Sequence, residues 1–204
     1  LIHLFDSIGR LVCHQMPSRT LRIGGHQLPV CARCTGAYLG LYIGYLLLPM
    51  RRRDKCGPPN LWITLSMTVP IIVDFTTQLT GFRTSTNEVR LMTGLLFGVA
   101  SAPWLVYLFP MIPTGRSLPI VHRLFPRRVE LDDKNSWLSP KAFGLGLLLT
   151  TALFSGISLI SGLDNPLFYW LLSPLIIVSV IWHIFLLPIL VLTLSLAYLL
   201  KKAR

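Results

Sequence analysis

Apolar stretches alternate with short polar or basic segments from residue 31 to the end of the chain. An α-helix needs about 20 mostly apolar residues to cross the hydrocarbon core of a bilayer, so this alternation predicts membrane-spanning helices. The last stretch is long enough to form either one kinked span or a broken helix around Pro174 and Pro188. We expect five spans, at residues 31–50, 61–75, 91–111, 142–160 and 167–200.

The first 30 residues follow two other patterns. Apolar residues recur at helical spacing in residues 1–12, over a length too short to cross a membrane. This predicts an amphipathic helix that lies at the membrane surface. Residues 13–30 are polar and contain Gly24 and Gly25, which predicts a surface loop.

Together these patterns predict an all-α polytopic membrane bundle that forms a single integral membrane domain, residues 1–204. Glycines recur at every fourth residue in the first and third spans. This spacing lets two helices approach closely, and it also favours an oligomer formed through the glycine faces. The domain divides into four parts: an interfacial helix with its loop (residues 1–30), a three-span core (31–111), a basic cytoplasmic loop (112–141) and two further spans (142–204).

The composition supports this class and adds an orientation. Hydrophobic residues make up 52% of the chain, and 19 basic residues exceed 8 acidic ones. The basic residues lie in short runs between apolar stretches, which is the positive-inside pattern of membrane proteins and predicts no nucleic-acid partner. Most of them follow the first, third and fifth spans, so the N-terminus is predicted to be extracytoplasmic. Every basic residue predicted outside is arginine, which binds carboxylates and phosphates through a planar fork.

Three cysteines and two histidines lie within 22 residues, at Cys13-His14, His26 and Cys31-x-x-Cys34. Two thiolates at the Cys-x-x-Cys spacing can bind one tetrahedral zinc ion, and Cys13 supplies a third sulfur. His14, His26 or water would complete the site, which is either structural or catalytic. The alternative is a redox site, because thiols on an oxidising face form disulfides and a Cys-x-x-Cys at a helix N-terminus is reactive.

A second group of polar residues is predicted at the same face of the membrane. Asp74 ends the second span, where an unpaired carboxylate is costly. It is expected either to form an ion pair with Arg83 or Arg90 that fixes the bundle, or to act as a general base or a partner of the metal site. The other members favour a pocket for an anionic head group: Arg33, Gln78, Arg83, Asn87 and Arg90.

These motifs resemble those of a family of prokaryotic integral membrane proteins of unknown function. The shared signature comprises residues 13–15, Cys-His-Gln, the pair Ser18-Arg19, and residues 29–36, Pro-Val-Cys-Ala-Arg-Cys-Thr-Gly, followed by Tyr38 and Gly40. A second similar patch runs from Asp74 to Gly94. The resemblance covers roughly residues 10–100 and implies a multi-pass protein of the prokaryotic plasma membrane. It gives more weight to His14 than to His26, and it implies no particular activity.

Three functions fit these observations. The first is a zinc-dependent enzyme acting on membrane lipids or a lipid-linked anionic substrate, with Asp74, His14 and Arg90 catalytic and the other polar residues binding the substrate. The second is a thiol–disulfide or quinone-linked membrane oxidoreductase. The third is a non-enzymatic transporter or assembly factor that contains structural zinc.

Overall fold

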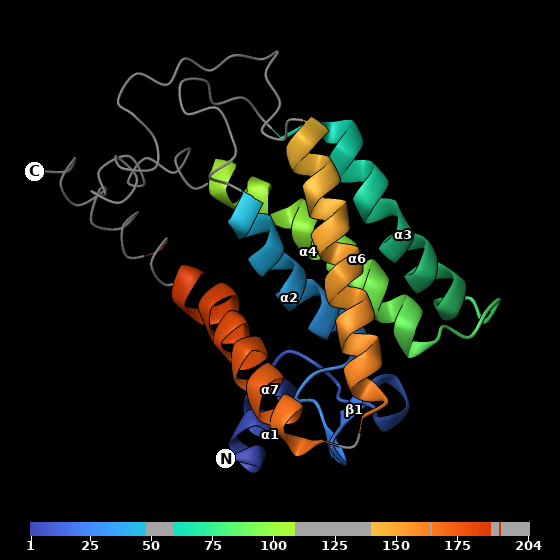
Figure 1. The fold of residues 1–204 in the computed structure, drawn as a ribbon. Helices are drawn as coiled ribbons and strands as arrows, with labels where there is room; N and C mark the ends of the chain where they lie inside the picture. The colour runs from blue at the N-terminus through green and yellow to red at the C-terminus, as the bar shows by residue number, and fades with distance from the viewer. Residues whose placement is uncertain (48–58, 109–139, 164, 189–191, 193–204) are drawn as a thin grey trace, which may run out of the picture.

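The computed structural model describes residues 1–47, 59–108, 140–163, 165–188 and 192, and these residues are mostly helical (Figure 1). The predicted basic loop and the end of the last apolar stretch lie largely outside them. The N-terminal elements are α1 (Ile2–Arg10), η1 (Pro17–Arg19), β1 (Arg22–Ile23) and β2 (His26–Gln27). The longer helices are α2 (Ala32–Leu47), α3 (Leu61–Leu79), α4 (Asn87–Leu108), α6 (Pro140–Ser161) and α7 (Pro166–Val180), which continues into the π-helix η5 (Ile181–Leu186).

The helical fold class is confirmed. Among the described helices, two are long and apolar enough to cross a membrane, at Phe143–Ser161 and Pro166–Phe185. The count of five spans and the orientation of the chain stay predictions. Helix α6 begins at Pro140, as expected from a proline in the first turn.

Two local predictions from the sequence were wrong. The second span was expected to end at Phe75, but helix α3 continues to Leu79. The hydroxyls of Thr76 and Thr77 donate to carbonyls of the preceding turn, so these polar side chains are satisfied within the helix. The loop at residues 13–30 contains a small antiparallel hairpin, in which Ile23 pairs with His26. Gly24 and Gly25 both have positive φ, which a two-residue hairpin connection requires.

Helices α2 and α4 pack in direct backbone contact along their glycine faces. A Cβ atom at Gly36 would collide with the carbonyl oxygen of Leu91, and one at Gly40 would collide with that of Leu95. From Gly36 to Gly40 the contact moves four residues forward on α2, and its partner on α4 also moves four residues forward. The two helices therefore run parallel. Their N-termini therefore lie at the same end of the bundle, and these glycine faces are used within one chain.

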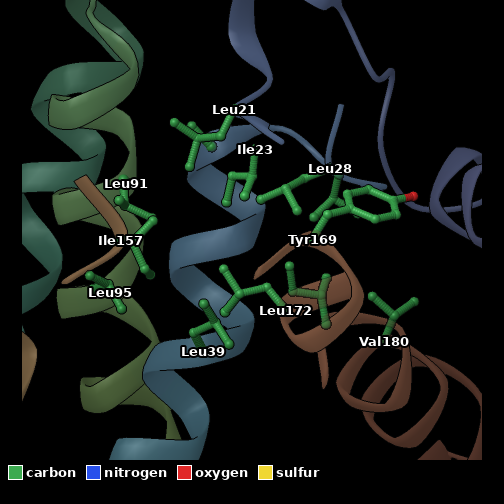
Figure 2. Packing of buried hydrophobic residues seen from close by; sticks show 13 residues of the cluster. Leu21, Ile23, Leu28, Leu39, Leu91, Leu95, Ile157, Tyr169, Leu172 and Val180 are labelled. Carbon is green, nitrogen blue, oxygen red and sulfur yellow. The ribbon is translucent and has the colours of Figure 1, made fainter. Parts of the chain in front are cut away.

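The N-terminal segment is fixed to that same end of the bundle. Figure 1 shows α1 and β1 beside the start of α7. Ile23 and Leu28 of the hairpin segment are buried in one cluster with Leu39 of α2 and Tyr169 of α7 (Figure 2). Burial of these side chains holds the loop between α1 and α2 against the bundle, which positions the cysteines that flank it.

Candidate metal site and arginine cluster

The three N-terminal cysteines come together in the structure. Cys13 follows α1, Cys31 immediately precedes α2, and Cys34 lies in the first turn of α2. Their sulfur atoms all lie within 4.8 Å of one another, and all three are partly buried free thiols. The segment between Cys13 and Cys31 therefore forms a closed loop whose two ends meet at the sulfurs.

Gln15 fastens this loop to α1. Its Nε2 atom donates to the carbonyl oxygens of Asp6, at 2.8 Å, and Pro29, at 2.6 Å, while its Oε1 accepts from Arg10 Nε. Gly9 lies so close to Pro29 that a Cβ atom there would collide with the proline carbonyl. These contacts join the end of α1 to the residues before α2, and so bring Cys13 to Cys31.

Replacing Gln15 with alanine is therefore expected to weaken the binding of a metal ion such as zinc that the three thiols could hold, by about 10- to 100-fold, the usual cost of losing a group that orients metal ligands. Competition with a chelator of known affinity measures this change. Gln27→Ala is the control, because no hydrogen bond of the Gln27 side chain is found among the described residues. Equal affinities for the two variants would contradict this role of Gln15.

The arrangement of the thiols suits a cation. Hydrogen bonds from the thiols of Cys31 and Cys34 lower the pKa of the Cys13 thiol far below its usual value, and the backbone N–H of Cys31 adds another at 3.2 Å. Three sulfurs on one tetrahedral zinc ion would lie about 3.8 Å apart, given Zn–S bonds of about 2.3 Å. The observed spacing therefore allows three thiolates to bind one ion without a change of fold.

The two histidines are not part of this cluster of potential ligands. Among the described residues, only the three cysteines bring their ligand atoms within 4.8 Å of one another. His14 is exposed, and the ring of His26 packs against Tyr169 at 5.1 Å between centroids. The described residues thus provide three ligands, and a fourth position would be open to water or a substrate oxygen.

Asp74 is buried, with 2% of its side chain exposed, and accepts hydrogen bonds from two arginines. Arg33 NH2 donates to its Oδ2, and Arg83 NH2 donates to its Oδ1 at 3.2 Å. The expected pair with Arg83 is present, whereas the pair with Arg33 was not foreseen. The residue before Cys34 is thus tied directly to the end of α3.

Two more contacts hold the Arg33 guanidinium in place. Its NH2 lies 3.3 Å from Gln78 Oε1, and the group packs over the ring of Phe75 at 5.7 Å. Arg33 therefore has a fixed position between the start of α2, where Cys34 lies, and the polar end of α3.

Arg90 lies in the first turn of α4, next to this group. Its NH1 donates to Asn87 Oδ1 at 2.9 Å, as expected for residues three apart on a helix. It is close enough to Cys31, Arg33 and Asp74 for their charges to act on it. Arg90 thus lies near both the cysteine cluster and the arginine–aspartate group.

Gln15 and Tyr38 belong to the signature found in the sequence, but neither was predicted to be part of the site. The part played by Gln15 was hidden because its partners are main-chain carbonyls. Tyr38, one turn after Cys34 on α2, lies close enough for the charges of all three thiols to act on it. Its spacing of four residues from Cys34 could have revealed it, since such residues share a helix face.

Comparison with known proteins places the chain in a family. The predicted membrane protein family DUF2085 matches residues 13–103. An uncharacterised protein of Methanothermobacter thermautotrophicus is 40% identical over 96 residues, which cover 46% of this chain and 83% of that protein. The chain belongs to the DUF2085 family. Another uncharacterised protein, from Methanocaldococcus jannaschii, is 41% identical over 100 residues, or 48% of this chain.

The DUF2085 match contains both halves of the site. It begins at Cys13, includes Arg33, Cys34 and Asp74, and ends inside α4 beyond Arg90. Helices α1, α6 and α7 lie outside it. The chain spans 64% of the length of the M. jannaschii protein. No solved structure matches the chain.

Proposed function

We propose that this DUF2085 protein is a zinc-dependent membrane enzyme that acts on an anionic group of a lipid-linked or membrane-embedded substrate. The observation that supports it most strongly is the meeting of three thiols with a fixed, partly buried arginine one residue from Cys34. A zinc ion on three protein ligands keeps an open position, where it polarises a substrate oxygen or activates water. Arg33 and Arg90 would hold the negative charge of the substrate beside it.

We further propose five spans, with the site at the extracytoplasmic face. The outward face of α3 supports a membrane location, because large apolar side chains are exposed along it, including Trp62, Val69, Ile72 and Phe75. Exposed apolar faces of this extent are unfavourable in water and suited to lipid. The distribution of lysine and arginine supports the orientation.

The reaction would be hydrolysis of a phosphoryl or acyl group. The oxygen of water bonds to the phosphorus or carbonyl carbon, the bond to the leaving oxygen breaks, and a proton passes from water to His14 and then to the leaving oxygen. His14 suits this role because it is exposed beside Cys13. Asp74 would position Arg33, since both its oxygens already accept hydrogen bonds from guanidinium groups.

The test uses purified protein in vesicles that contain either a polyprenyl diphosphate or a fatty-acyl ester lipid. We expect release of phosphate or fatty acid that stops on removal of zinc by a chelator and resumes when zinc is added back. Turnover that is unaffected by chelation would contradict the proposal. Bound zinc without turnover of any substrate would favour an assembly factor or transporter with structural zinc.

A second candidate function is thiol oxidation by a membrane quinone. The lowered pKa of Cys13 beside two further thiols supports it. Two thiols would form a disulfide, and the quinone would take up two electrons and two protons to become a quinol. Thiol labelling of protein purified without reductant, then unfolded in chelator, separates the two functions: four free thiols support the metal site, and two support the redox site.

A further inference from the structure

Two arginines of the site carry hydrogen-bond donors that lack an acceptor in the part of the chain that the structure describes. The Nε atoms of Arg33 and Arg90 are buried and have no hydrogen-bond partner among the described residues. Arg90 as a whole is only 7% exposed. A buried guanidinium nitrogen without an acceptor is costly, so each of these two donors calls for an acceptor that the described residues do not supply.

The charges nearby specify the sign of that acceptor. The charges of Arg19 and Arg33 both act on Arg90, and the opposing charges that act on it are those of Asp74 and Cys31. The Asp74 carboxylate is already bound to Arg33 and Arg83. The guanidinium groups outnumber the opposing negative charges of Asp74 and a Cys31 thiolate, and the excess positive charge would be neutralised by an anionic ligand; the four groups are those of Arg19, Arg33, Arg83 and Arg90.

The backbone adds to the positive electrostatic potential around these arginines. Arg33 and Arg90 each lie in the first turn of a long helix, and α2 and α4 run parallel with their N-termini at one end. A Cβ atom at Gly94 would collide with the carbonyl oxygen of Arg33, so the first turns of the two helices are in contact. The positive ends of two helix dipoles thus lie at the end of the bundle where Arg33 and Arg90 lie.

We propose that Arg33 and Arg90, with Arg19 beside them, form a binding site for a phosphate dianion. This inference rests on the proposed function and specifies the substrate class of its site. A carboxylate carries a single charge, whereas a phosphate dianion matches the excess charge of this cluster. Its tetrahedral oxygens can accept from several guanidinium groups at once.

The test measures saturable binding of inorganic phosphate to the purified full chain by equilibrium dialysis. Arg90→Lys keeps the charge but removes the Nε donor and the planar fork, and we expect about 10- to 100-fold weaker binding. Arg19 is exposed, so Arg19→Gln tests the site without disturbing the fold, and weaker binding is expected here too. Arg22→Gln, an exposed change on β1, is the matched control and should leave binding unchanged.

A second arm identifies the source of the phosphate. Bilayers with phosphatidic acid are compared with bilayers of phosphatidylcholine alone as competitors of inorganic phosphate. Competition by phosphatidic acid supports a lipid phosphate in this site, and its absence supports a soluble phosphate. No saturable binding, or equal binding by the Arg90→Lys and Arg22→Gln variants, would overturn the inference.

Zinc content measured on the same samples separates this inference from the proposed function. If the protein contains zinc and turns over substrate but does not bind phosphate, the phosphate site is rejected and the proposed function stands. Phosphate binding by protein that contains no zinc as purified and gains no turnover on zinc addition supports the site and rejects the zinc enzyme.

Discussion

Replacing Cys34 with serine is expected to reduce bound zinc from one ion per chain to nearly none. Cys34 supplies one of three sulfurs that converge within 4.8 Å, and a serine hydroxyl is a poor zinc ligand at neutral pH. The remaining two thiolates would not hold the ion through purification. Elemental analysis of the purified variant, expressed per mole of chain, gives the result directly.

Cys56→Ser is the matched control for this experiment. It removes one thiol from the same chain, at a position outside both the Cys-His-Gln and Cys-x-x-Cys motifs. We expect it to retain the zinc content of the unmodified protein. Equal zinc in the Cys34 and Cys56 variants would show that the ion is held elsewhere.

Replacing Asp74 with alanine is expected to destabilise the folded protein by about 3–5 kcal/mol, the usual cost of breaking a buried ion pair from one side. The change leaves Arg33 partly buried, at 18% exposure, without its carboxylate partner. It also removes the link between the start of α2 and the end of α3. The free energy of unfolding in a denaturing detergent measures this loss.

Arg83→Gln breaks the other ion pair of the same carboxylate and provides a graded comparison. Arg83 is 53% exposed, so water and salt screen its charge and the expected cost is about 0–1 kcal/mol. If the two variants lose the same stability, the pair of Arg33 with Asp74 is not what joins these helices.

Several features could be predicted from the sequence because they depend on short spacings. The glycine repeat predicted close helix packing, and the structure places Gly36 and Gly40 against the backbone of α4. The Cys-x-x-Cys spacing predicted that Cys31 and Cys34 share a site. Asn87 and Arg90, three residues apart, form the expected contact within one helix.

Other features depend on which helices are neighbours, and no spacing along the chain reveals that. Arg33 and Asp74 are 41 residues apart and meet because α3 ends beside the start of α2. The bonds of Gln15 to main-chain carbonyls depend on the fold of the loop. Likewise, only the tertiary structure shows that the cluster within 4.8 Å contains the three thiols and neither histidine.

The central claim is that three cysteines bind one zinc ion and leave its fourth position open. The zinc X-ray absorption spectrum of the purified unmodified protein tests it most directly. We predict three sulfur neighbours at about 2.3 Å and one nitrogen or oxygen neighbour at about 2.0 Å. Protein that binds no zinc, or zinc with a shell lacking sulfur, would contradict the claim.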